Sequence, residues 1–189
     1  NVIDYLNGAY RYNWEYVYSY QKYIKPLLSG MLYGNDYIGD IRIYKDSERG
    51  FTAPEHIVDK AAMPSHIREE LGRLPPGKGF WYCKLEESGE WTLAYYQNMY
   101  AERFSKHVGV FAVEVDPKLL AGFVKTLSNE GRSEVYLLTG DLKSSPPGAR
   151  EDMIGKMLER PSAYFFLDRK SLVVNHLTIE ELGLRAAVV

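Results

Sequence analysis

The middle of the chain alternates apolar and polar residues in a way that predicts β-strands. Between residues 38 and 44, Ile41 and Ile43 would face one side of a strand while Arg42 and Tyr44 would face the other, as in a half-buried strand. The same pattern predicts three further strands, at residues 80–85, 91–100 and 107–115. Because short polar segments join these three strands, we expect them to form one antiparallel sheet.

Helical spacing dominates the N-terminal segment, residues 2–31. Apolar and aromatic residues recur there at Tyr5, Leu6, Ala9, Tyr10, Trp14, Val17, Tyr18 and Tyr20. This spacing predicts a long helix with a broad aromatic stripe. Pro26 should end or bend the helix, because proline lacks a backbone N–H and its ring crowds the preceding turn. Shorter helices are expected at 65–74 and 118–127, and a weak strand at 51–57, returning from a charged hairpin loop.

A second, smaller unit is expected after a turn-rich linker near residues 128–131. Its pattern predicts a helix at 149–160 and strands at 134–139, 163–167, 170–177 and 185–189. The predicted fold class is therefore α+β, with a long N-terminal helix packed on two tandem antiparallel-sheet modules, the second one small. The expected divisions are an N-terminal stalk helix at 1–37, a first module at 38–127 and a shortened second module at 128–189.

The composition is that of an ordinary globular protein. The chain has 189 residues, of which 46% are hydrophobic and 25% charged, and its formal net charge is −2. Lys and Arg do not cluster, so nucleic acid is not an expected partner. No run of 18 apolar residues could span a bilayer. Because the chain begins without Met and ends on an apolar run, we expect an excised piece of a longer protein, linked to a membrane only through missing flanking helices.

Catalytic motifs are missing from the sequence, so this fragment is not expected to be an enzyme. The four histidines lack the spacing of metal ligands: His56, His66, His107 and His176. The Gly-Lys-Gly of residues 77–79 leads into a predicted strand, whereas a phosphate-binding loop leads into a helix. The sequence has no Gly-x-Ser-x-Gly nucleophile motif. We therefore expect no cofactor, no metal site and no catalytic residues.

Aromatic and polar side chains gather instead on the predicted central strands. We take them as candidate ligand-binding residues: Trp81, Tyr82, Tyr95, Tyr96, Asn98 and Glu114. Tyrosine suits a binding surface, because its ring packs while its hydroxyl forms hydrogen bonds.

Glu114 is the unusual member of this set, since an unpaired carboxylate is costly to bury in an apolar strand. By alternation it shares a face with Val108, Val110 and Ala112. If that face lines a pocket, an amine-bearing ligand would suit the carboxylate. The alternative is an ion pair with a basic residue of the protein, for which the candidates are Lys84, Arg103 and Lys106.

The order of these segments resembles the double Cache domain, an extracytoplasmic sensor with two PAS-like modules. The resemblance is carried by Ile41-Arg42-Ile43-Tyr44, Phe80-Trp81-Tyr82, Tyr95-Tyr96-Gln97 and the strand at 109–115 with the helix after it. The N-terminal helix would match the stalk helix of that family. Residues 164–167 and 171–174 look like strands of a shortened second module.

This resemblance implies a sensory role. Members of the family commonly sit between two transmembrane helices of bacterial histidine kinases, chemoreceptors, cyclic-dinucleotide enzymes or helix-turn-helix regulators. The strand signature is most similar to that of sensor histidine kinases. We therefore expect the extracytoplasmic ligand-sensing domain of a two-component sensor histidine kinase, on the extracellular side of a bacterial cell membrane, binding a small polar metabolite.

The resemblance also bears on the ligand. In amino-acid binders of the family, an Arg stands two residues before a Trp-Tyr pair in the membrane-distal module, and an Asp on a later strand takes the ligand amine. Trp81 and Tyr82 match the pair, and Glu114 could replace the Asp. The Arg position is occupied by Gly79, so the half of the motif that clamps a carboxylate is absent.

A different class of function remains open on the same residues. The tyrosine stripe of the N-terminal helix could form an interface, which would make the chain a ligand-free dimerisation or protein-interaction module and a homodimer through that helix. As a further alternative, the domain could be the outer part of a chemoreceptor or of a membrane-anchored helix-turn-helix regulator.

Overall fold

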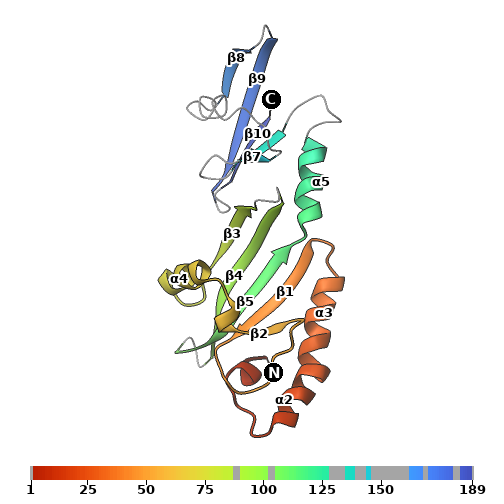
Figure 1. The fold of residues 1–189 in the computed structure, drawn as a ribbon, viewed down its shortest axis with the longest axis vertical. Helices are drawn as coiled ribbons and strands as arrows, with labels where there is room; N and C mark the ends of the chain where they lie inside the picture. Colours follow the sequence, from red (N-terminus) through yellow and green to blue (C-terminus); the bar gives the residue numbers. More distant parts are fainter. Residues whose placement is uncertain are drawn as a thin grey trace. The chain divides into compact units, whose positions relative to one another are not determined.

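The computed structural model describes residues 2–86, 90–101, 105–127, 135–138, 144–145, 162–167, 170–180 and 184–188. The chain divides into two compact units, Asn1–Trp81 with Ala94–Asp116 and Tyr82–Leu93 with Pro117–Val189. The structure has two five-stranded sheets, one formed mainly by residues of the first unit and one formed by C-terminal residues (Figure 1). The predicted α+β class is confirmed.

The N-terminal segment is helical, but it is not one continuous helix. It consists of α1 (Val2–Leu6), α2 (Asn13–Ser19), the π-helix η1 (Tyr20–Ile24) and α3 (Lys25–Tyr33). The prediction of an unbroken helix is wrong because Gly8, with a φ of 70°, takes the left-handed conformation that ends a helix. Pro26 does not end the helix, since it lies in the first turn of α3, where its missing N–H costs little.

The first sheet has the strand order β2-β1-β5-β4-β3. Its strands are β1 (Ile38–Lys45), β2 (Ile57–Asp59), β3 (Gly79–Leu85), β4 (Trp91–Ala101) and β5 (Lys106–Val115). β5 pairs antiparallel with both β1 and β4. The predicted return strand at 51–57 is wrong, because β2 begins at its last residue and runs parallel to β1. Residues 46–56 cross over instead of forming a tight hairpin, which makes this sheet mixed.

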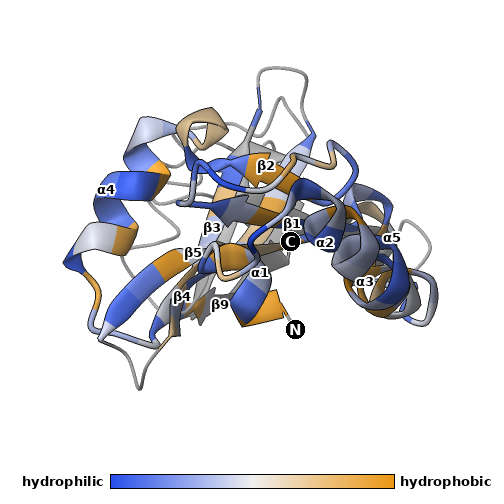
Figure 2. Ribbon diagram, turned by 90° about the horizontal axis from the view of Figure 1, so that it is seen from below, coloured by the Kyte–Doolittle hydropathy of each residue, from blue (hydrophilic) through white to orange (hydrophobic). Residues whose placement is uncertain are grey.

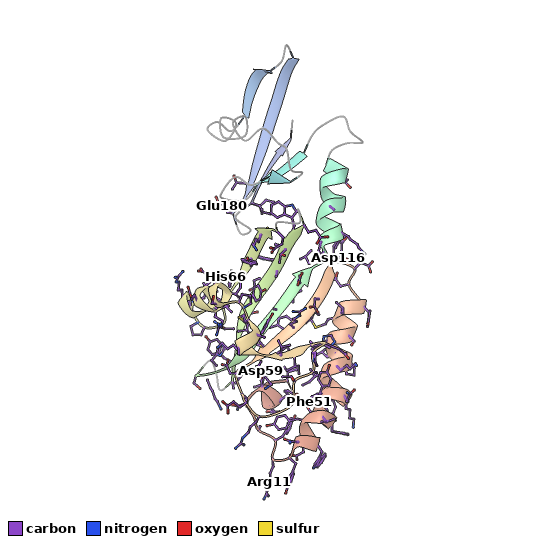
Figure 3. The ribbon with its side chains drawn as sticks, in the orientation of Figure 1. Arg11, Phe51, Asp59, His66, Asp116 and Glu180 are labelled. Carbon is purple, nitrogen blue, oxygen red and sulfur yellow. The ribbon has the colours of Figure 1, made fainter. Side chains whose placement is uncertain are left out.

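The two faces of the first sheet have different partners. Its core face packs against the N-terminal helices in a cluster that includes Tyr5, Tyr16, Tyr20, Ile24, Leu28, Ile41 and Ile43. The opposite face is covered by the 3-10 helix η2 (Lys60–Ala62) and by α4 (Ser65–Arg73), whose Ile67 and Leu71 are buried. Figure 2 shows α4 on one side of the sheet and α2 and α3 on the other, and Figure 3 shows Phe51 beside the N-terminal helices and His66 on α4.

A β-bulge alters the alternation of β5. The pairing with β4 shifts register between Met99 and Tyr100, so that Val108 packs in the core with the N-terminal helices. The prediction that Val108 shares the face of Glu114 is therefore wrong. Val110 and Ala112 do share that face. Bulges of this kind re-aim side chains, and here His107 comes to face Asn98.

The second unit contains α5 (Pro117–Leu127) and the strand order β7-β6-β10-β9-β8. Its strands are β6 (Val135–Leu138), β7 (Ser144–Ser145), β8 (Ser162–Leu167), β9 (Lys170–Ile179) and β10 (Leu184–Val188). Every pair for which a register is defined is antiparallel. The four predicted strands are present, and β7 lies between the strand predicted at 134–139 and the helix predicted at 149–160. The helix predicted at 149–160 lies outside the described residues. The predicted limits of the stalk and of the two modules stay predictions.

Candidate ligand-binding site

A cavity of about 250 Å³ lies on the α4 face of the first sheet. Three adjacent strands, β1, β5 and β4, contribute most of its lining: Asp40, Arg42, Tyr44, Ala94, Tyr96, Ala112 and Glu114. Ala62 and Pro64, just before α4, complete it. The strand residues meet because Ala112 is paired with Arg42 on one side and with Tyr96 on the other, and paired residues share a face. The volume suits a small metabolite, since pockets for drug-sized ligands begin at about 300 Å³.

Two carboxyl groups and one guanidinium line this cavity. The Nε of Arg42 lies 2.6 Å from Oδ2 of Asp40, so these two charges balance. Glu114 stands directly opposite Asp40 in the β1–β5 ladder. Burial, and then repulsion by Asp40, raise the pKa of Glu114 above its ordinary value, although Arg42 acts against this rise. The cavity therefore holds one carboxyl group more than its guanidinium can balance, and a cation would stabilise the ionised form.

In the described part of the chain, none of the basic residues considered as alternative partners forms an ion pair with Glu114. Lys84 lies 2.6 Å from Glu86 instead. Lys106 forms no ion pair with Glu114 there, and Arg103 lies outside the described residues.

The six predicted site residues do not form one group. Tyr96 and Glu114 line the cavity together. Asn98 lies on the same face of β4 but lines a second cavity, of about 240 Å³, next to His107 and Leu71. Tyr82 is half-buried and belongs to the other unit.

Tyr95 points to the opposite face of β4, because it is next to Tyr96 in a strand whose side chains alternate. Its ring packs against the indole of Trp81, with 5.3 Å between ring centroids. Trp81 is 38% exposed. The aromatic pair that matched the family motif is therefore not part of the cavity lining in the first unit.

Three cavity residues with charged or aromatic side chains were not among the predicted set: Asp40, Arg42 and Tyr44. The signal that could have found them was present in the sequence. They occupy every second position of the strand predicted at 38–44, on the face opposite to the buried Ile41 and Ile43. A face of one acid, one base and one tyrosine next to an apolar face is typical of a strand that lines a polar pocket.

No helix among the residues that the structure describes is long and apolar enough to cross a bilayer. The same residues contain no group of three His, Cys, Asp or Glu side chains placed to hold a metal ion.

The fold is similar to that of extracellular ligand-binding domains of known structure, and the expected resemblance to double Cache domains is confirmed at the level of the fold. The sequence matches no protein-family model and no curated protein. The likeness is seen in solved structures at low sequence identity.

Three of these structures illustrate the likeness. The extracellular domain of rpHK1S-Z16, described as a histidine kinase, is 15% identical, with a TM-score of 0.59 over 92% of this chain and 80% of that one. The ligand-binding domain of a Campylobacter jejuni chemoreceptor, in complex with 4-methylisoleucine, is 11% identical. Its TM-score is 0.59 over 88% of this chain and 69% of that one. The ligand-binding domain of the Pseudomonas aeruginosa amino-acid chemoreceptor PctC, in complex with GABA, is 12% identical. Its TM-score is 0.52 over 91% of this chain and 92% of that one.

Proposed function

We propose that this chain is the extracytoplasmic sensor domain of a bacterial transmembrane receptor, and that the cavity beside Glu114 binds a small polar metabolite through a protonated amine. The observation that carries the proposal is the half-buried, raised-pKa carboxyl of Glu114 opposite Asp40 in a metabolite-sized cavity. An ammonium group entering there would neutralise the surplus negative charge. Tyr44 and Tyr96 would provide ring surfaces and hydroxyl groups to a small organic cation.

The solved structures with the same fold support this ligand class. Two of them hold GABA and 4-methylisoleucine, both of which carry an amine. They also support a location outside the cell and a role in signalling, since one is described as part of a histidine kinase and two as parts of chemoreceptors. Among these receptor types, we favour a two-component sensor histidine kinase. Signalling would require the ligand to bind one of two arrangements of the domain more tightly than the other.

The variant Glu114→Gln tests the proposed site. Wild type is expected to bind at least one of GABA, isoleucine and putrescine in isothermal titration calorimetry, and Glu114→Gln should bind that ligand at least about tenfold more weakly, because a hydrogen bond to a charged group contributes about 1.5–3 kcal/mol. The same variant should melt at a higher temperature than wild type at pH 7. A carboxyl whose pKa is raised on folding makes the fold less stable as pH rises above the ordinary value of 4.5, and Gln removes this loss.

The gain in melting temperature should shrink as pH falls toward 4.5 and disappear well below that value, where Glu114 is protonated in both the folded and the unfolded state. Glu69→Gln, a change of an exposed carboxyl on α4, serves as the control and should alter neither binding nor the pH dependence. Equal binding of the amine by wild type and Glu114→Gln, or the absence of binding by any of the three amines, would count against the proposed site.

A second candidate function is self-association through the N-terminal helices. Trp14 is 65% exposed, and Tyr18 and Tyr23 are about half exposed on the same segment. Lys22 lies over the rings of both tyrosines, at 5.0 and 5.4 Å. Exposed aromatic side chains of this kind are enriched in protein interfaces, and a second copy of the chain would cover them in a two-fold symmetric pair.

Trp14→Ala is expected to convert a wild-type dimer into a monomer in multi-angle light scattering. Because Trp14 is largely exposed, its removal should change the free energy of unfolding by no more than about 0.5 kcal/mol. A wild-type chain that is monomeric at high concentration would exclude this function. A large loss of stability in Trp14→Ala would show that the indole serves packing within the chain.

A further inference from the structure

The second cavity on the α4 face differs from the first in its charge. It has a volume of about 240 Å³. Two basic side chains line it, Lys60 from η2 and Arg68 from α4. His107 from β5 also lines it. No carboxyl group is part of this lining, whereas Asp40 and Glu114 both line the first cavity. The two cavities therefore favour ligand groups of opposite charge.

The positive charges of the second cavity are only partly balanced. Asp46 is not part of the cavity lining but contacts two residues that are: its Oδ1 lies 2.9 Å from Nζ of Lys60, and its Oδ2 contacts Nδ1 of His107. Burial alone would raise the pKa of Asp46, but its hydrogen bonds from His107 and Lys60 hold that pKa below the ordinary value. Within the described residues, the guanidinium of Arg68 has no ion-pair partner. Arg68 is exposed and lines the cavity, so its N–H groups are available to a ligand.

Three residues of the cavity lining, Leu71, Asn98 and His107, are joined by hydrogen bonds. Asn98 is buried, and its Nδ2 donates to the backbone oxygen of Leu71 at 3.0 Å, which ties β4 to α4. This orientation directs Oδ1 of Asn98 to Nε2 of His107, at 2.9 Å. Both nitrogens of His107 are therefore engaged by the protein, so the donors open to a ligand are those of Arg68 and Lys60. A lining with satisfied polar groups keeps its geometry when a ligand binds.

The remaining walls are apolar or aromatic. Leu71 and Leu74 come from the end of α4, and the ring of Tyr100 stands edge-on to His107 with 5.2 Å between centroids. A ligand with a single anionic group and a short apolar tail would match a lining that combines two basic side chains with two leucines. A phosphate would leave the leucine walls without a partner.

We propose that this second cavity binds a short-chain monocarboxylate, whose carboxylate is held by Arg68 and Lys60 and whose alkyl tail packs on Leu71 and Leu74. The site is separate from the amine site and its existence does not depend on it. The sensor would then respond to two chemically different ligands that bind on the same face of one sheet.

Butyrate is the probe, titrated into the whole chain at low ionic strength, where screening is weak. Wild type is expected to bind butyrate, and Arg68→Gln should weaken this binding at least about tenfold. Arg73→Gln is the matched control: Arg73 is also an exposed arginine of α4, 3.1 Å from Glu70, and it does not line the cavity. Its replacement should leave butyrate affinity within about twofold. Thermal melts of both variants confirm that the fold is retained.

Four results would overturn the proposal. The first is the absence of butyrate binding by wild type at millimolar concentration. The second is an equal loss of affinity in both arginine variants, which would indicate a general charge effect. The third is a loss of butyrate binding in Glu114→Gln, which would place the anion in the first cavity. Binding of inorganic phosphate without butyrate would refute the monocarboxylate class. Failure of the amine titrations alone would leave the butyrate result intact, so the two sites are tested independently.

Discussion

Gly79→Arg is expected to destabilise the domain by about 3 kcal/mol or more and to confer no amino-acid binding. Gly79 occupies the position at which amino-acid binders of the double Cache type carry Arg. A Cβ atom at Gly79 would overlap the carbonyl oxygen of Tyr96 and would stand 2.5 Å from the hydroxyl oxygen of Tyr95. Because one of these atoms belongs to the backbone of the neighbouring strand, the clash cannot be relieved by a change of rotamer. The free energy of unfolding, measured by urea titration, checks this prediction.

Gly79→Ala and Lys78→Arg separate the effect of the steric clash at Cβ from the effect of an added guanidinium group. A glycine inside a strand usually costs about 0.5–1 kcal/mol relative to alanine, so Gly79→Ala would stabilise the chain if space allowed. We expect the opposite sign, because the clash begins at Cβ. Lys78→Arg brings a guanidinium to the adjacent exposed position and should be neutral within about 0.5 kcal/mol. A stable Gly79→Arg protein that binds isoleucine more tightly than wild type would contradict this prediction.

Four strands of the first sheet, β1, β3, β4 and β5, could be predicted because their signal is local. Ile41 and Ile43 are buried and Arg42 is exposed, as their alternation indicates. The break in the N-terminal helix was harder to predict. Gly8 takes its positive φ where its Cα lies close to Ser47 and Arg49, from a loop almost 40 residues later in the chain. Local helical spacing carries no information on a contact of this kind.

The candidate site likewise depends on long-range contacts that local sequence patterns do not reveal. Glu114 and Tyr96 could be predicted to share a pocket, because each is a polar or aromatic residue on a central strand. Tyr95 and Tyr96 could not both line it, since adjacent residues of a strand face opposite ways. The strand pairing that decides between them, Tyr96 with Ala112 and Ala112 with Arg42, is a long-range property.

His107 is the clearest case of a residue that the sequence pattern conceals. Strict alternation from Glu114 puts positions of even number on the cavity face and would turn His107 toward the core. The bulge between Met99 and Tyr100 shifts the register by one residue, so that His107 faces Asn98 at 2.9 Å. A bulge adds one residue to one strand without a reliable local signature, and the second cavity depends on it.

Tyr5→Ala is expected to cost about 3–5 kcal/mol of folding free energy, the largest loss for a single side chain in the N-terminal core. Tyr5 is 0% exposed. Its ring packs edge-on against Tyr16 and Phe51, at 5.2 and 6.2 Å between centroids. Its hydroxyl donates a hydrogen bond to the backbone oxygen of Phe51 at 2.7 Å. Truncation therefore leaves a cavity and an unsatisfied carbonyl group together. Urea unfolding, followed by tyrosine and tryptophan fluorescence, measures the loss.

Tyr5→Phe isolates the hydrogen bond from the packing and should cost about 1–3 kcal/mol, the effect of one buried acceptor without its donor. Tyr33→Ala, at a side chain that is 83% exposed, should change stability by less than about 0.5 kcal/mol. Burial, followed by repulsion from Tyr20 and Tyr16, raises the pKa of Tyr5, so ionisation opposes folding as pH rises above its ordinary value of 10.0. Tyr5→Phe should accordingly lose less stability than wild type between neutral and strongly alkaline pH. If Tyr5→Ala were no more destabilising than Tyr33→Ala, α1 could not be anchored to the first sheet through this ring, and the aromatic core would have to rest on Tyr16 and Tyr20 alone.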